Sequence, residues 1–114
     1  PLLTSPKLAS NQWIFSWSPA YDVTSTAGSV TYRLQIARNP TFDADSIFVD
    51  IGAIDDAADT VTQGVDADQL PSGEYFARLI ATPANESERN WQVSGNKLYY
   101  DNQVYYGTHR FVIP

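Results

Sequence analysis

The sequence predicts an all-β protein in which two antiparallel sheets pack face to face as a β-sandwich. Residues that favour strands are frequent, in a chain that is 43% hydrophobic and 13% aromatic. Several short segments alternate apolar with polar residues, and clusters of glycine, proline, asparagine and serine separate them. The length of 114 residues fits one domain, so we expect residues 1–114 to form a single module.

The segment from Leu70 to Ala81 is the clearest strand. Pro71 and Gly73 favour a tight turn before it, because proline fixes its own φ and glycine tolerates a positive one. We expect the Tyr75 ring in the core, with Leu70 covering it and its hydroxyl bonded to the backbone of the turn. One face of this strand is apolar and is formed by Tyr75, Ala77, Leu79 and Ala81. The other face carries a charge, so we expect it to point outward, and it is formed by Phe76, Arg78 and Ile80.

The first half of the chain holds three predicted strands. Residues 1–10 read as a linker with a short edge strand around Leu2 to Thr4. The segment Gln12 to Ser18 alternates around three rings, of which Trp17 should be in the core. Residues 20–29 are rich in small polar residues and predict a loop, and Val30 to Ala37 predicts the strand that packs opposite Trp17.

The second half contains shorter patterns. Ile47 to Ile51 predicts a fourth strand, residues 53–59 fit either one helical turn or a loop, and Thr60 to Ala67 predicts a fifth strand with Val65 and Ala67 inward. His109 to Ile113 predicts the last strand. The connection before this last strand is too long for a simple hairpin loop. We therefore expect an inserted hairpin there, in which a turn at residues 101–103 joins the strands Leu98–Tyr100 and Val104–Tyr106.

Two of these motifs give a family resemblance. Phe15-Ser16-Trp17-Ser18-Pro19 and the Leu-x-x-Gly-x-Tyr pattern at residues 70–75 resemble those of fibronectin type III domains, a resemblance that covers most of the chain from Gln12 to Ile113. It implies an immunoglobulin-like sandwich of seven strands, with the inserted hairpin as a departure. Residues 90–93 and 105–107 resemble the type III modules that accompany bacterial spore-coat CotH kinase-like proteins and other secreted enzymes. The resemblance implies an extracellular or cell-surface location.

Composition and motifs argue against several function classes. A net charge of −6, a pI near 4.4 and 7 scattered basic residues disfavour nucleic acid and anionic membranes, and no apolar run approaches a membrane span. No cysteine is present, and the single histidine, His109, has no second histidine to complete a metal set. No hydrolase nucleophile motif or phosphate-binding loop occurs. The acidic residues Asp55, Asp56 and Asp59, with Asp50 nearby, fit either a solvated loop or a weak calcium site.

One constellation of aromatic residues has several interpretations. The rings of Trp91, Tyr99, Tyr100, Tyr105 and Tyr106 all lie in or near the inserted hairpin. Adjacent strand residues point to opposite faces, so each tyrosine pair should send one ring inward and one outward. The rings either pack beneath the long loop or contact a ligand or another protein, and Trp91, Tyr99 and Tyr106 are the candidates for that contact.

The sequence therefore predicts a non-catalytic module without a cofactor. The leading interpretation is a spacer or protein-interaction module of a larger secreted or surface bacterial protein, whose partners are the neighbouring domains of the same polypeptide or other proteins. Trp17, Leu70 and Tyr75 are its structural residues. The alternative is a carbohydrate-binding accessory module that contacts polysaccharide through the aromatic residues of the long loop at residues 83–108.

Overall fold

The computed structural model of this chain describes residues 2–19, 30–57, 59–83, 91–92 and 95–114, without the side chains of Pro83, Trp91 and Gln92. The prediction of an all-β protein is confirmed. Within the described residues no helix is long and apolar enough to cross a membrane. The elements are β1 Lys7–Ala9, β2 Gln12–Trp17, β3 Val30–Ala37, η1 Ala44–Ser46, β4 Ile47–Asp55, β5 Val61–Asp66, η2 Ala67–Gln69, β6 Gly73–Pro83, β7 Trp91–Gln92, β8 Lys97–Tyr100, β9 Gln103–Tyr106 and β10 His109–Ile113, where η marks a 3-10 turn.

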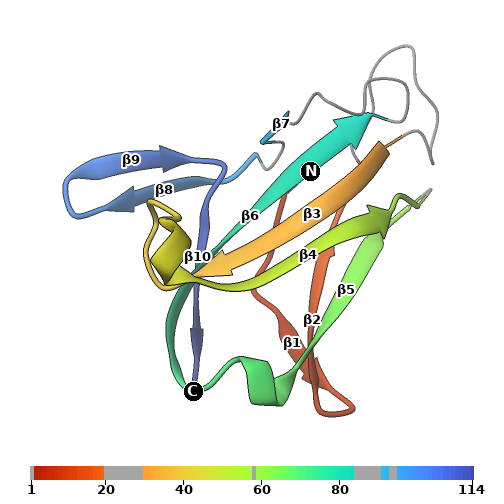
Figure 1. The fold of residues 1–114 in the computed structure, drawn as a ribbon, viewed down its shortest axis with the longest axis horizontal. Coiled ribbons are helices and arrows are strands. Elements are labelled where there is room, and N and C mark those ends of the chain that lie inside the picture. Colours follow the sequence, from red (N-terminus) through yellow and green to blue (C-terminus); the bar gives the residue numbers. More distant parts are fainter. Residues whose placement is uncertain (1, 20–29, 58, 84–90, 93–94) are drawn as a thin grey trace.

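The strands form three antiparallel sheets (Figure 1). The smaller main sheet has the order β1-β2-β5, and the larger has the order β10-β6-β3-β4, with β7 beside β6. The third sheet is the separate hairpin β8–β9, which projects to the left in Figure 1. The segment predicted as a loop at residues 20–29 lies outside the described residues.

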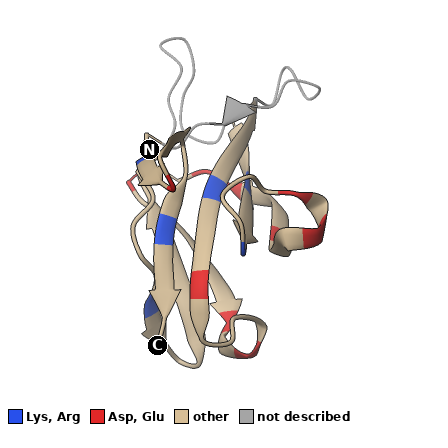
Figure 2. Ribbon diagram, turned by 90° about the vertical axis from the view of Figure 1, so that its left-hand side faces the viewer, with Lys and Arg blue, Asp and Glu red and all other residues tan. Residues whose placement is uncertain are grey.

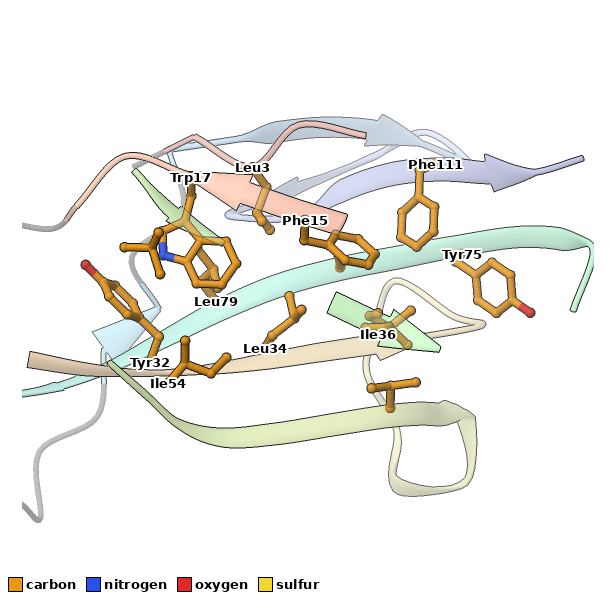
Figure 3. Close-up of a cluster of buried hydrophobic side chains, with 14 of the residues drawn as sticks. Leu3, Phe15, Trp17, Tyr32, Leu34, Ile36, Ile54, Tyr75, Leu79 and Phe111 are labelled. Carbon is orange, nitrogen blue, oxygen red and sulfur yellow. The ribbon is translucent and has the colours of Figure 1, made fainter. Parts of the chain in front are cut away.

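The two main sheets enclose one hydrophobic core. Phe15 and Trp17 of β2 face Leu34 and Ile36 of β3, as Figure 3 shows. Three rings continue this layer toward β10, with Phe15 edge-on to Phe111 at 5.3 Å between ring centres and Phe111 stacked on Tyr75 at 5.6 Å. Burial of this continuous apolar layer is the main term that stabilises the fold.

The end of β6 that carries Tyr75 has the hydrogen bond that the sequence predicted. The ring is fully buried, and its hydroxyl donates to the carbonyl oxygen of Pro71 at 2.5 Å. Burial raises the pKa of Tyr75, against the opposing effect of the Arg38 charge, whose guanidinium carbon lies 4.7 Å from the ring centre. Gly73 allows this packing, because it has a φ of +149° and a Cβ there would lie 2.4 Å from the Arg38 Nη1.

The N-terminal segment differs from its prediction. The first strand is Lys7–Ala9, and the prediction of a strand around Leu2 to Thr4 is wrong. Leu3 is instead a core residue, and its backbone N–H and carbonyl are bonded by the side-chain amide of Asn96, at 2.9 Å each. An amide side chain therefore takes the place of a neighbouring strand at this position.

The middle of the chain also differs in detail. β4 continues from Ile47 to Asp55, so the helical turn considered for residues 53–59 does not form in the part that is described. β5 buries Val61 and Val65, but Ala67 is only half-buried. The chain turns into η2 at Ala67, which ends the alternation that would have pointed this residue inward.

The hairpin interrupts the strand that pairs with β6. Ile80 of β6 pairs with Gln92 of β7. If the same register continued, Ala77 would pair with residue 95, but it pairs with His109. Fourteen residues are therefore inserted between the two paired segments, and they contain β8 and β9. The predicted boundaries of the last strand, His109 to Ile113, are confirmed.

Candidate functional site

The candidate site is one face of the β8–β9 hairpin. A two-residue turn at Asp101 and Asn102 joins the strands, with φ of +50° and +63°. Both residue types tolerate these angles, and this mirror-image turn matches the right-handed twist of a hairpin. The register pairs Lys97 with Tyr106 and Tyr99 with Val104, so strand alternation brings these four side chains to the same face.

We call Lys97, Tyr99, Val104 and Tyr106 the hairpin outer face, and it is open to solvent. Tyr99 is 70% exposed and Tyr106 is 71% exposed, and Val104 is exposed as well. The Lys97 ammonium lies over both rings, 5.1 Å from the centre of Tyr99 and 5.5 Å from that of Tyr106. Rings with polar edges beside a cation form a surface suited to contact with another molecule.

The opposite face of the hairpin is fixed to the larger sheet. Leu98 and Tyr100 pack against a second apolar cluster formed by Ala37, Phe42 and Phe76. The Tyr100 ring meets Phe76 edge-on at 5.1 Å between ring centres. This packing also explains why Phe76 is buried, although it lies on the strand face predicted to look outward.

Polar contacts hold the hairpin at two further points. The Tyr100 hydroxyl donates to Glu74 Oε1 at 3.1 Å, and this hydrogen bond raises the pKa of Tyr100. Glu74 Oε2 accepts a bond from Arg110 Nε at 2.5 Å. At the base of the hairpin the Gly107 N–H donates to the Asn96 carbonyl, while the Asn96 side chain binds Leu3. These contacts therefore hold the hairpin that carries the outer face in a fixed position.

The structure places the predicted residues in two groups. Trp17, Leu70 and Tyr75 are buried in the main core. Tyr99 and Tyr106 come together on the hairpin outer face, whereas Tyr100 and Tyr105 are half-buried. The backbone of Trp91 pairs with Ala81, but its side chain lies outside the described residues.

His109 lies at the start of β10 and contacts the N-terminal segment. Its Nε2 is 3.0 Å from the Ser5 hydroxyl, and its ring stacks near Phe111. Burial lowers the pKa of His109. No carboxylate contacts this ring in the part of the chain that is described, so the pair lacks the third group that orients a catalytic histidine.

The acidic residues considered for calcium do not gather into one site. Within the described residues, no group of three or more His, Cys, Asp or Glu is placed to hold a metal ion. Asp56 accepts a hydrogen bond from the Tyr32 hydroxyl at 2.8 Å, and Asp50 is paired with Arg33. The side chains of Asp50 and Asp56 are therefore engaged in separate protein contacts.

Sequence reasoning missed two features near this site. Lys97 belongs to the outer face, and its alternation with Tyr99 along β8 was a usable signal. The contact between Asn96 and Leu3 had no local signal, because the two residues are 93 positions apart.

Comparisons with protein-family models, curated proteins and solved structures gave no match for this chain.

Proposed function

We propose that this chain is a non-catalytic fibronectin type III-like module that holds and contacts other domains of a larger secreted or surface bacterial protein. The observation that carries the proposal is the hairpin outer face. The molecule fixes one side of an inserted ribbon firmly and leaves two tyrosines more than two-thirds exposed on the other. Tyrosine is enriched at the centres of protein interfaces, because it buries a large ring while its hydroxyl keeps a polar partner.

The body of the module supports a mechanical role. Seven of its strands lie in two sheets with the orders β1-β2-β5 and β10-β6-β3-β4. This is the number of strands in a type III sandwich. The Tyr75 hydroxyl bond to Pro71 and the buried Trp17 also favour this family. The Pro114 carbonyl accepts a bond from the Ser72 hydroxyl at the turn before β6, whereas Leu3 is bonded to Asn96 at the base of the hairpin. The two ends of the described chain therefore lie apart, with the C-terminus at the lower end of Figure 1, an arrangement that suits a spacer between two neighbours.

A carbohydrate-binding module is the second candidate. Two exposed tyrosines on one face favour it, because flat rings stack on sugar faces. The Lys97 ammonium weighs against it, since it already lies over both rings and a neutral sugar would have to displace it. We therefore favour a protein partner at this face.

The test uses the double variant Tyr99→Ala/Tyr106→Ala in the full-length polypeptide. We expect the contact with a neighbouring domain to be lost, measured as faster tumbling of the module and new protease sensitivity at its flanking segments. The matched control is Tyr105→Ala, which removes a half-buried tyrosine of the same hairpin and leaves the outer face intact. Unchanged tumbling and protease sensitivity in the double variant would contradict the proposal.

Affinity electrophoresis separates the two candidates. Gels that contain soluble cellulose, xylan, chitin or mannan fragments should not retard the module. Retardation that disappears in the double variant, while the unfolding midpoint stays the same, would establish the carbohydrate alternative instead.

A further inference from the structure

The side of the larger sheet that faces away from the core carries three arginines and three carboxylates among the described residues. We call this the polar sheet face, and its described charged and amide residues are Arg33 and Gln35 of β3, Asp50 and Asp55 of β4, Glu74 and Arg78 of β6, and Arg110 of β10. It holds three of the 7 basic residues of a chain whose net charge is −6. Most of the other acidic residues that the structure describes lie in loops and turns, and Figure 2 shows such red segments at the right and bottom of the view.

Asp50 and Glu74 are both already paired with an arginine, whereas Asp55 lies opposite Thr31 at the end of β4. Asp50 accepts two bonds from Arg33, from Nε and from Nη2, each at 2.5 Å, and this contact lowers the pKa of Asp50. Glu74 accepts one bond from Arg110 and one from the Tyr100 hydroxyl. Arg78 is therefore the arginine of this face that has no carboxylate partner among the described residues.

The Arg78 side chain is nevertheless held in a defined position. Its Nε donates to Gln35 Oε1 at 2.8 Å, and its guanidinium carbon lies 4.2 Å from the centre of the Phe42 ring. Gln35 is buried, and its amide nitrogen donates in turn to Asp50 Oδ2 at 3.3 Å. The chain of contacts from Asp50 through Gln35 to Arg78 crosses three neighbouring strands, so the guanidinium is oriented by the sheet itself.

This arrangement leaves the two terminal nitrogens of Arg78 without a protein partner in the described part of the chain. Arg78 is half-buried, and burial lowers its pKa, as does the nearby positive charge of Arg33, against the weaker opposing effect of the Asp50 charge. A cation that is partly removed from water and has no carboxylate within hydrogen-bond distance gains more from one than an exposed cation does. The fixed planar group also loses little side-chain freedom on binding.

We propose that Arg78 is the anchor of a second interaction surface, which binds an aspartate or glutamate side chain of a protein partner. The two terminal nitrogens form a planar fork that matches the two oxygens of a carboxylate. A polyphosphate or nucleic acid requires several unpaired cations, whereas this face offers one. The surface involves different residues from the hairpin outer face, so the inference stands independently of the function proposed above.

The test is an NMR titration of the whole module with hexaglutamate at a constant ionic strength near 0.15 M, which screens long-range repulsion from the net charge. We expect saturable shifts of the Arg78 Nε–Hε and Gln35 side-chain amide resonances, with the Arg110 Nε–Hε resonance unmoved. Arg78→Gln should weaken hexaglutamate binding about tenfold or more, because it removes one charge-assisted contact. A tenfold change in affinity corresponds to about 1.4 kcal/mol. Arg110→Gln, which removes an arginine that is already paired, is the matched control and should bind within about twofold of the wild type.

Arg78→Lys keeps the positive charge but removes the planar fork. It serves as the second variant in case Arg78→Gln does not fold. It should weaken hexaglutamate binding while the amide spectrum stays that of the folded module. The proposal would be overturned by equal shifts with hexaglutamine, by sulfate binding as tightly as hexaglutamate, or by binding that survives both substitutions of Arg78.

Discussion

Tyr75 in the main core and Tyr99 on the hairpin are both strand tyrosines, yet the first is fully buried and the second is 70% exposed. The hydroxyl of Tyr75 donates to a turn carbonyl, and rings cover it on two sides. Tyr99 instead lies on the hairpin outer face, with the Lys97 ammonium 5.1 Å from its ring centre. The comparison teaches that the same residue type serves the fold in one region and remains available to a partner in the other.

The largest effect should come from the main core. Trp17→Ala removes a side chain that is 2% exposed and should lower the free energy of unfolding by about 3–5 kcal/mol. Trp17→Phe is the informative control, because the indole N–H has no acceptor in the described structure and its loss strands no polar group. Urea melts of both variants would measure the difference, and equal losses would show that ring volume is not the main contribution of Trp17.

The next effect concerns the hydroxyl of Tyr75. Tyr75→Phe keeps the ring and leaves the Pro71 carbonyl without its donor, so we expect a loss of about 1 kcal/mol in the free energy of unfolding. The urea midpoint should fall while the slope of the transition stays constant. An unchanged midpoint would mean that water replaces this bond at no cost.

His109 should give the fold a pH dependence. Burial lowers its pKa in the folded state, so the unfolded chain binds a proton more readily. Stability should therefore be complete above the unfolded value near 6.5 and decline as pH falls from there through the folded value. His109→Gln should show a smaller loss of melting temperature between pH 7.5 and pH 5.5 than the wild type, and equal losses would place the titrating group elsewhere.

The ion pair of Arg33 and Asp50 should contribute least. Both side chains are substantially exposed, so Asp50→Asn should cost only about 0.2–1 kcal/mol at neutral pH. The pKa of Asp50 is lowered in the folded state, so this contribution is present above the unfolded value near 3.9 and is lost as pH falls through the folded value. The difference in melting temperature between variant and wild type should therefore shrink in acid, and a difference that persisted there would contradict the assignment.

The sequence was most informative where the signal is local. The alternation in Val30 to Ala37 and in His109 to Ile113 predicted both strands with their boundaries. The hairpin was predictable because its turn residues and its alternating tyrosines lie within ten positions. The outward position of Tyr99 and Tyr106 follows from the same alternation once the register is known.

Other features depend on contacts between distant parts of the chain. The N-terminal strand was misplaced because the Asn96 amide, far along the sequence, binds the backbone of Leu3. Phe76 was expected on an exposed face because nothing in its own strand shows that Leu98 and Tyr100 cover it. That Arg78 has no carboxylate partner among the described residues likewise depends on where Asp50 and Glu74 lie after folding.

The central claim is that the two faces of the hairpin have different roles, and adjacent residues of β8 test it most directly. Leu98 is half-buried against the second cluster and Tyr99 is on the outer face. We predict that Leu98→Ala lowers the free energy of unfolding by about 1–2 kcal/mol and that Tyr99→Ala changes it by less than about 0.5 kcal/mol, both from urea melts. A loss in Tyr99→Ala equal to or larger than that in Leu98→Ala would contradict the claim, because the outer tyrosine would then be part of the fold.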